Sequence, residues 1–569
     1  MKKRIILVLV PIVLIIIIVA AAFGGKIWDR FSYSREHADL NEYFGLTEDS
    51  DCAIVLQDEI VDDMAKFVHG THYFTLSTVE KYFTDRFYVN TDEQVLLFTT
   101  DTDVIKINIG DASNVMYVSD TPQELDYMAA FYDGDVLYIA AKYVQKFANF
   151  EYYGFTEPEH MQVYTQWDEY TSAKLTKKTA VRYQGGIKSP ILQELPADAQ
   201  VTVLEEMDNW SKVKTESSII GYVENKRLTD KTVSQRMCGT DFQEIVYNNV
   251  QKEGMINLAF HQVFENVDGN YLANALNSTK SVNVVSPTWF RLTDNNGGIA
   301  SLANASYVSK AHELGIDVWA LVTDVDSTNL YGVTIDFDEL LSSSEKRKVL
   351  ISALMNEVDT YGLDGINIDF EKVKSSAGTH FVQFLREISI ETRRRGIVLS
   401  VDNYVPSEYT AHYNRKEQGI VADYIIIMGY DEHYVGGGVA GSNASIGFVE
   451  DGNTKEVVPA EKIINAIPFY TRIWETGPNG LTASTIAMSA EPSWIAQTGV
   501  TPGWSDEFCQ NYAEYQSGDT LYQCWLEDVD SIRVKLQVMQ NQGIKGVASW
   551  KLGLEDSAVW DVIAEYVGQ

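Results

Sequence analysis

Short apolar runs alternate with longer segments of helical periodicity from about residue 240 to the C-terminus. This alternation predicts βα units that build a parallel sheet. Eight strands in about 330 residues predict an α/β fold, a closed TIM (β/α)8 barrel with its active site at the C-terminal strand ends. The eight predicted strands span residues 256–260, 282–286, 318–322, 365–371, 398–402, 424–428, 463–467 and 546–550.

Helical spacing of apolar residues marks the segments on either side of the fourth predicted strand. Leu350, Leu354 and Val358 recur at this spacing before it, and Gly362 stands where a C-terminal cap belongs. Phe381 and Ile388 belong to a similar pattern after it. The fourth strand is therefore expected between two helices.

Two smaller domains are predicted before the barrel, which takes residues 240–569. Residues 178–230 read as five short strands, at 180–183, 191–192, 201–204, 210–213 and 220–223, and predict a small all-β domain. Residues 40–165 mix strands, such as 95–98 and 136–139, with helices, and predict an α+β stalk domain without a catalytic cluster.

An uncharged apolar stretch at residues 5–22 follows Lys2, Lys3 and Arg4. It is just long enough to cross a bilayer as a helix, and the basic flank places the N-terminus inside. Residues 1–25 are therefore expected to be a signal anchor of a single-pass membrane protein with an extracellular catalytic domain. A cleaved signal peptide, ending near Ala20–Ala22, is the alternative and would give a secreted protein.

The formal charge of -35, from 45 basic and 80 acidic residues, argues against nucleic acid as a partner. The four cysteines, Cys52, Cys238, Cys509 and Cys524, form no CxxC pair and predict no zinc site or cofactor. Cys509 and Cys524 are close enough in sequence to bridge one hairpin, and four unpaired buried thiols are the alternative.

The fourth predicted strand carries the strongest candidate chemistry. Its period of two places Asn367, Asp369 and Glu371 on one face, opposite Ile366 and its apolar neighbours. In a barrel the polar face points inward. Buried acids need partners and their pKa values move apart, so one carboxyl can stay protonated for acid catalysis. The structural alternative is that the acids cap the barrel end or bind a cation.

The octapeptide Asp364-Gly365-Ile366-Asn367-Ile368-Asp369-Phe370-Glu371 resembles the signature of glycoside hydrolase family 18. Asn367 stands where chitinases of the family usually have Asp. With Asn at this position, the sequence resembles the bacterial branch that includes spore cortex-lytic N-acetylglucosaminidases. Further matches are Met428-Gly429-Tyr430-Asp431, residues 467–470 and Ala548-Ser549-Trp550, so the resemblance covers residues 242–569. Residues 471–543 correspond to an insertion that ends in a helix at 531–542.

This resemblance implies a substrate-assisted, retaining mechanism in which the acetamido oxygen of the sugar attacks the anomeric carbon. It implies that Glu371 is the acid and base, that Asp369 orients the acetamido nitrogen and that Tyr430 contacts its carbonyl. Asn367 would support Asp369 through a hydrogen bond, and Trp550 would lie beneath the sugar. Asp431 and Met428 are expected near the substrate, and Trp289, Trp319 and Trp474 are candidate sugar platforms.

The implied partner is an N-acetylglucosamine-containing polysaccharide, peptidoglycan or chitin-like, in the cell wall. Residues 178–230 resemble a bacterial SH3-like domain through features such as Trp210-Ser211-Lys212-Val213, and residues 136–147 of the stalk resemble the copper amine oxidase N-terminal type. The alternative function is a non-catalytic glycan-binding protein built on a hydrolase barrel.

Overall fold

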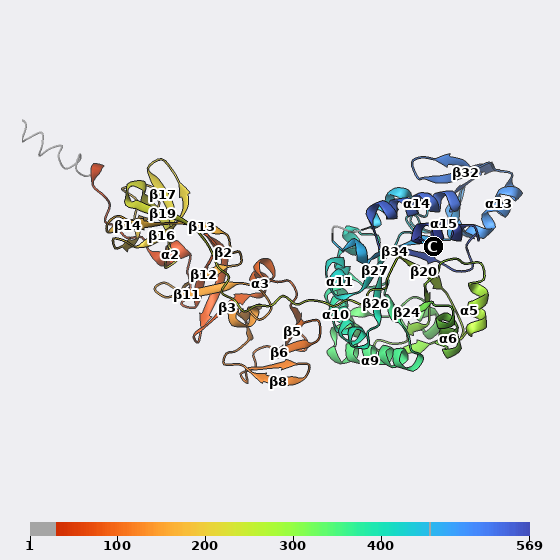
Figure 1. Cartoon of the computed structure of the whole chain (residues 1–569), viewed down its shortest axis with the longest axis horizontal. Coiled ribbons are helices and arrows are strands. Elements are labelled where there is room, and N and C mark those ends of the chain that lie inside the picture. The colour runs from red at the N-terminus through yellow and green to blue at the C-terminus, as the bar shows by residue number, and fades with distance from the viewer. Residues whose placement is uncertain (1–29, 454–456, 569) are drawn as a thin grey trace, which may run out of the picture. The chain divides into compact units, whose positions relative to one another are not determined.

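The computed structural model describes residues 30–453 and 457–568 and divides into two compact units (Figure 1). The first takes in the described part of Met1–Val89 together with Gln94–Phe98 and Ile105–Glu244. The second contains Asn90–Glu93, Thr99–Val104 and the rest of the chain from Ile245. No helix of the described residues is both long and apolar enough to cross a bilayer, and the predicted anchor at 5–22 lies outside them.

A seven-stranded sheet with the order β11-β12-β1-β2-β3-β10-β9 forms one part of the first unit. Its strands are β1 (Asp51–Leu56), β2 (Glu59–Val68), β3 (Thr71–Thr75), β9 (Ala130–Asp133), β10 (Val136–Ala140), β11 (Glu151–Phe155) and β12 (His160–Tyr164). The short helices are α2 (Leu40–Phe44), α3 (Leu76–Tyr82) and α4 (Ala141–Val144). A smaller sheet follows the order of β4 (Tyr88–Asn90), β5 (Val95–Thr99), β6 (Val104–Asn108), β7 (Val115–Val118) and β8 (Thr121–Glu124).

The strands predicted at 95–98 and 136–139 are confirmed as β5 and β10. The helix α4 that follows β10 spans four residues and ends at Val144. The copper amine oxidase resemblance of this region stays a prediction.

The second sheet of this unit has the order β15-β14-β18-β17-β16-β13-β19. The five strands predicted there are confirmed as β14 (Thr179–Arg182), β15 (Ile191–Leu195), β16 (Gln200–Glu206), β17 (Trp210–Thr215) and β18 (Ile220–Glu224). Two further strands, β13 (Glu169–Leu175) and β19 (Leu228–Gln235), extend it. The sequence pattern missed β19 because nearly all of its side chains are exposed, so it has no apolar alternation.

The second unit contains the predicted barrel, whose eight strands are confirmed. They are β20 (Ile256–His261), β21 (Val284–Pro287), β24 (Asp317–Thr323), β25 (Gly365–Asp369), β26 (Val398–Tyr404), β27 (Tyr424–Met428), β28 (Ile463–Pro468) and β34 (Gly546–Trp550). All neighbours pair in parallel, and the pairing of β21 with β24 closes the sheet into a ring. Two short antiparallel strands, β22 (Phe290–Leu292) and β23 (Ile299–Ser301), extend the sheet beside β24.

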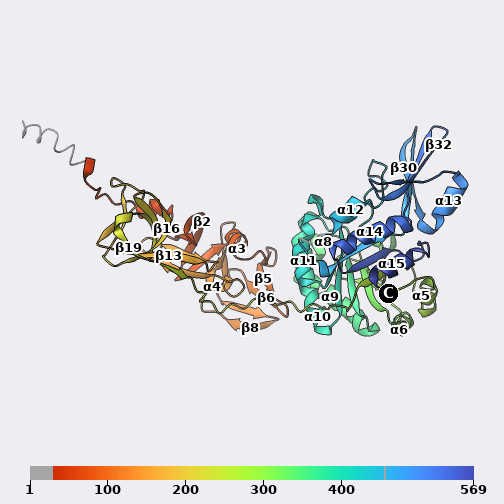
Figure 2. The same ribbon diagram turned by 45° about the horizontal axis from the view of Figure 1, so that its top comes forward.

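Helices surround the barrel strands in Figure 2. They are α5 (Gly269–Ala275), α6 (Ala305–Glu313), α7 (Ser327–Tyr331), α8 (Phe337–Ser342), α9 (Ser344–Tyr361), α10 (Gly378–Arg395), α11 (Arg415–Val421), α12 (Ile446–Gly452), α14 (Val529–Gln542) and α15 (Val559–Val567). The predicted cap is confirmed: Gly362 ends α9 in the left-handed conformation, with φ 65°. The helix expected after the fourth strand is α10.

Two apolar layers hold the barrel together. The outer layer joins Ile366, Ile368 and Phe370 of the fourth strand segment to helix residues such as Leu354 and Phe384. The inner layer contains side chains such as Leu258, Trp319 and Ile426. The predicted faces of the fourth strand are therefore confirmed, because its apolar residues pack outward.

The insertion between β28 and β34 is a five-stranded antiparallel sheet with one helix. Its strands are β29 (Tyr470–Gly477), β30 (Gly480–Ala487), β31 (Gly503–Ser505), β32 (Gln510–Ser517) and β33 (Thr520–Trp525), and its helix is α13 (Glu491–Thr498). All four cysteines are free, so no Cys509–Cys524 bridge forms. Cys524 lies opposite Ala513 in the hairpin. The alternative of four unpaired buried thiols is confirmed in part: the thiols are unpaired, but Cys238 is exposed.

Candidate active site

The fourth strand ends two residues earlier than predicted, at Asp369. Beyond this point the backbone groups of Glu371 form hydrogen bonds with side chains. The amide of Glu371 donates to Asp324 Oδ1 at 2.8 Å, and the carbonyl of Glu371 accepts from the hydroxyls of Tyr404 at 3.2 Å and Tyr413 at 3.1 Å. These three side chains fix the backbone that carries Glu371.

The Glu371 side chain is half-buried at the C-terminal end of the barrel. Tyr404 donates its hydroxyl to Glu371 Oε2 at 2.9 Å. Burial raises the pKa of Glu371, and the charges of Asp324 and Asp431 raise it further, while the bond from Tyr404 lowers it. A carboxyl with a raised pKa keeps its proton at a higher pH, as an acid catalyst requires.

Asp369 lies on the same strand face and is 8% exposed. Burial raises the pKa of Asp369 well above its ordinary value, and the charges of Glu371, Asp402 and Asp324 raise it further. Burial likewise raises the pKa of Asp402 and of Asp324. Four carboxyls therefore gather at one end of the barrel, and they cannot all be ionised cheaply.

The contacts of Asn367 differ from the prediction. Its Nδ2 donates to Asp402 Oδ2 at 2.8 Å, and its Oδ1 accepts from Ser400 Oγ at 2.8 Å. The expected hydrogen bond from Asn367 to Asp369 is wrong, because the amide is directed across the sheet to β26. Asn367 is fully buried, and both ends of its amide hydrogen-bond to side chains of β26.

Tyr430 and Trp550 follow or end barrel strands, and both pack on the inner apolar layer. The Trp550 ring lies 5.3 Å from that of Phe260, and the Tyr430 ring lies 6.3 Å from that of Tyr470 in an edge-on arrangement. Burial raises the pKa of Tyr430 well above its ordinary value, so its hydroxyl keeps its proton and can donate a hydrogen bond. Both side chains are half-buried at the same end of the barrel as Glu371.

Asp431 is exposed, and its carboxylate is held by two residues of the insertion. Arg472 Nη2 lies 2.7 Å from Asp431 Oδ1, and the Tyr470 hydroxyl donates to the same oxygen. The backbone of Asp431 adopts the left-handed conformation, with φ 61°, and its amide donates to Asn443 Oδ1 at 3.2 Å. The insertion therefore fixes the segment that follows Tyr430.

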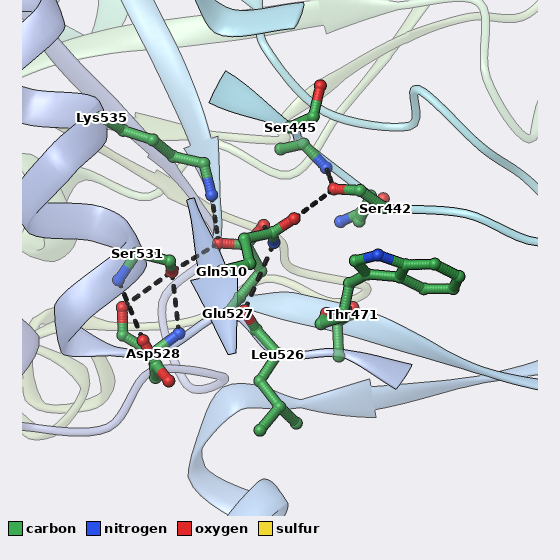
Figure 3. A network of polar contacts seen from close by, with 12 residues as sticks. Ser442, Ser445, Thr471, Gln510, Leu526, Glu527, Asp528, Ser531 and Lys535 are labelled. Atoms are coloured by element: carbon green, nitrogen blue, oxygen red, sulfur yellow. Dashed lines mark hydrogen bonds and ion pairs between the residues drawn. The ribbon is translucent and has the colours of Figure 1, made fainter. Parts of the chain in front are cut away.

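The segment that follows Tyr430 continues to Ser442, and a buried polar network connects Ser442 to the insertion (Figure 3). Ser442 Oγ donates to Gln510 Oε1, and Gln510 Nε2 donates to Glu527 Oε1 at 2.7 Å. Glu527 in turn forms an ion pair of 2.6 Å with Lys535 of α14, and both side chains are buried. The network links α14 to the loop that presents Tyr430 and Asp431.

Several residues that were predicted to contact the sugar are buried. Trp289 and Trp319 are fully buried and Trp474 is 1% exposed, so these three side chains cannot serve as sugar platforms. Met428 is 8% exposed at the end of β27, which leaves it little surface for a ligand. No three His, Cys, Asp or Glu side chains in residues 30–453 and 457–568 are grouped to hold a metal ion.

Sequence reasoning missed four residues around Glu371, namely Asp324, Asp402, Tyr404 and Tyr413. Asp324 follows β24, and Asp402 and Tyr404 lie within the last three residues of β26. A polar side chain at the C-terminal end of a barrel strand is the signal that could have found these three. Tyr413 lies in a loop helix, Glu408–Tyr413, where no strand pattern points to the site.

Comparison with known proteins gives two family matches. The model for glycosyl hydrolases family 18 matches residues 218–555, and the model for the bacterial SH3 domain matches residues 177–229. The second match confirms the predicted SH3-like fold.

Curated relatives match over shorter segments. The chain is 27% identical over 162 residues to the cortical fragment-lytic enzyme of Bacillus anthracis, which covers 27% of this chain and 36% of that protein. It is 28% identical over 186 residues to the putative sporulation-specific glycosylase YdhD of Bacillus subtilis (strain 168), covering 31% of this chain and 43% of that protein. The chain thus spans less than half the length of these relatives.

Solved structures align with the same region. A chitinase from Chromobacterium violaceum ATCC 12472 aligns with a TM-score of 0.49 at 23% identity, over 55% of this chain and 99% of that one. The Bacillus cereus spore cortex-lytic enzyme SleL aligns with a TM-score of 0.48 at 21% identity, over 56% of this chain and 75% of that one. Because its model matches more than half of the sequence, the chain belongs to glycosyl hydrolases family 18.

Proposed function

We propose that this protein is a retaining glycoside hydrolase that cleaves N-acetylglucosamine-containing glycans by substrate-assisted catalysis. The observation that carries the proposal is the position of Glu371: a half-buried carboxyl with a raised pKa beside Asp369, at the C-terminal end of the barrel. Membership of glycosyl hydrolases family 18 supports the reaction class.

In the proposed first step, Glu371 donates its proton to the glycosidic oxygen while the acetamido oxygen of the substrate attacks the anomeric carbon. The bond to the leaving sugar breaks, and an oxazolinium ion forms. Asp369 accepts a hydrogen bond from the acetamido nitrogen and stabilises the positive charge, and Tyr430 donates to the acetamido oxygen. In the second step, ionised Glu371 takes a proton from water, which attacks the anomeric carbon and restores its configuration.

Contacts at the rim support further roles. Trp550 packs on the inner layer beside Phe260 and would form an apolar floor beneath the reacting sugar. Asp431 is exposed and fixed by Arg472, so it can accept a hydrogen bond from a sugar hydroxyl. Asn367 would act through Asp402, to which it donates.

Peptidoglycan is the first glycan to test, because one curated relative is named a cortical fragment-lytic enzyme and another a putative sporulation-specific glycosylase. An exported enzyme held at the membrane by residues 5–22, with its barrel outside the cell, would act on the wall beside that membrane. We expect chitin-like oligosaccharides to be the second substrate class.

The test is product analysis by mass spectrometry with peptidoglycan and chitin oligosaccharides, using wild type, Glu371→Gln and Glu565→Gln. Glu565 is a matched control because its side chain is 75% exposed on α15. Wild type and Glu565→Gln should release fragments with reducing-end N-acetylglucosamine, and Glu371→Gln should fold but release almost none. Binding by wild type without cleavage would instead favour a non-catalytic glycan-binding protein.

Substrate assistance has its own test. The initial product should keep the anomeric configuration of the substrate in proton NMR, and the same oligosaccharide without its N-acetyl groups should resist cleavage. Inverted product, or equal cleavage of the de-N-acetylated substrate, would refute the proposed role of the acetamido group.

A further inference from the structure

Asn367 and Asp402 form a complementary pair across two neighbouring strands of the barrel. Asn367 Nδ2 donates to Asp402 Oδ2 at 2.8 Å, and both side chains are buried. An amide can donate to a carboxylate, whereas two carboxylates at these positions could pair only around a shared proton. In this pair the amide stands on β25, at position 367, and the carboxyl on β26, at position 402.

The register of the two strands places Asp402 beside Asp369. Asn367 pairs with Ser400 and Ile368 pairs with Val401, so Asp369 and Asp402 are the next residues of both strands. Both lie on the inward face, because side chains alternate along a strand. Inward side chains at one level of adjacent strands have Cβ atoms about 5 Å apart, which brings the two carboxyls within reach of each other.

One oxygen of Asp402 is left without a partner. Oδ2 accepts from Asn367, but Oδ1 is buried and no hydrogen-bond partner within the described residues reaches it. A buried carboxylate oxygen in this state is costly, and a proton on it would remove the charge and supply a donor. The titratable groups that face Asp402 are Asp369, Glu371 and Tyr430, and the register places the Asp369 carboxyl at its own level of the barrel.

We propose that Asp402 is a positioning residue that holds a proton for Asp369, so that the two carboxyls share one proton before substrate binds. When the acetamido N–H of the substrate reaches Asp369, the proton stays on Asp402 Oδ1, and Asp369 faces the substrate as a full carboxylate. The hydrogen bond from Asp402 to Asp369 breaks as the one from the acetamido N–H to Asp369 forms, and the reverse occurs when the product leaves. This role rests on the proposed function.

The test compares Asp402→Asn with the exchange variant Asn367→Asp/Asp402→Asn. The single variant removes the proton-holding carboxyl without changing its shape, and should lower kcat at least about 100-fold with KM changed less than about threefold. The exchange variant returns one carboxyl and one amide to the same two positions, and should recover kcat to within about tenfold of wild type. Melting curves establish that each variant is folded.

A second readout detects the proton directly. Infrared spectra at neutral pH are recorded in the Glu371→Gln background, which removes the proton of Glu371. Other buried carboxyls, such as Glu527, contribute to the protonated-carboxyl band, so the readout is the difference between variants. The band should lose intensity in Asp402→Asn and regain it in the exchange variant.

The outcomes separate this inference from the proposed function. If wild type cleaves glycans and Glu371→Gln does not, but Asp402→Asn turns over at the wild-type rate, the role of Asp402 is wrong and the function stands. An exchange variant that is folded but as slow as Asp402→Asn also overturns it. If wild type cleaves nothing, the proposed function fails, and an infrared band whose intensity is unchanged in Asp402→Asn overturns the shared proton independently.

Discussion

The hydrogen bond from Tyr404 to Glu371 should set the pH range in which the acid catalyst works. Its hydroxyl donates to Glu371 Oε2 at 2.9 Å and therefore stabilises the ionised carboxyl, which lowers the pKa of Glu371 against the larger effect of burial. In Tyr404→Phe the ionised form loses this donor. The pKa of Glu371 should then rise further above its ordinary value.

The size of the change follows from the strength of the bond. A hydrogen bond to a charged group contributes about 1.5–3 kcal/mol, and a change of one pKa unit corresponds to about 1.4 kcal/mol. Because both side chains are half-buried, water can replace part of the lost donor, so the lower end applies. We expect the pKa of Glu371 to rise by about one unit.

The assay is the pH dependence of kcat/KM on an N-acetylglucosamine oligosaccharide. The alkaline limb reports the acid that must be protonated in the free enzyme, so it should move about one unit to higher pH in Tyr404→Phe. Tyr413→Phe is the control, because its hydroxyl donates to the backbone carbonyls of Phe370 and Glu371. An unchanged alkaline limb, or one moved to lower pH, would refute the assignment of Glu371 and Tyr404.

Three further changes test the framework around the site. Gly365→Ala would place a Cβ 2.8 Å from Trp319 Cδ1 and 2.9 Å from the Val398 carbonyl, and should lower the free energy of unfolding by about 1–3 kcal/mol in chemical denaturation. Lys535→Met leaves the carboxyl of Glu527 buried without its cation and should cost about 3–5 kcal/mol at neutral pH. Because burial raises the pKa of Glu527 to about 7, this cost should shrink as the pH falls below 7; an equal cost at pH 5 would count against the ion pair. Asn443→Ala removes the acceptor of the Asp431 amide and should lower kcat/KM about 10- to 100-fold in a folded protein, and wild-type kinetics would show that this loop needs no such anchor.

The barrel strands could be predicted because each is buried on both faces and bounded by turns. Residues such as Ile366 and Ile368 form apolar runs that are short enough for strands and alternate with helical patterns. The inward polar residues of the fourth strand interrupt such a run at every second position, which is why Asp369 could be placed on the inner face. Local pattern was sufficient for these elements.

The contacts between strands could not be predicted in the same way. Whether Asn367 meets Asp369 or Asp402 depends on the register of β25 against β26, which the sequence pattern does not fix. Tyr404 reaches Glu371 from a strand that begins 27 residues further along the chain. Trp319 was expected near sugar, but it stacks on Tyr424 inside the barrel with ring centroids 5.3 Å apart, because a large apolar side chain on an inward position fills the interior.

The directions of the pKa shifts help to decide whether the acidic residues of the fourth strand serve catalysis or structural support. Acids that cap a barrel end would find hydrogen-bond donors, which lower the pKa of a carboxyl. Burial instead raises the pKa of Asp369, Asp402 and Glu371, so ionising these groups opposes folding at neutral pH. The two apolar layers of the barrel must offset that cost. A cluster that weakens the fold yet lies where barrel enzymes place their chemistry is better explained by catalysis than by structural support.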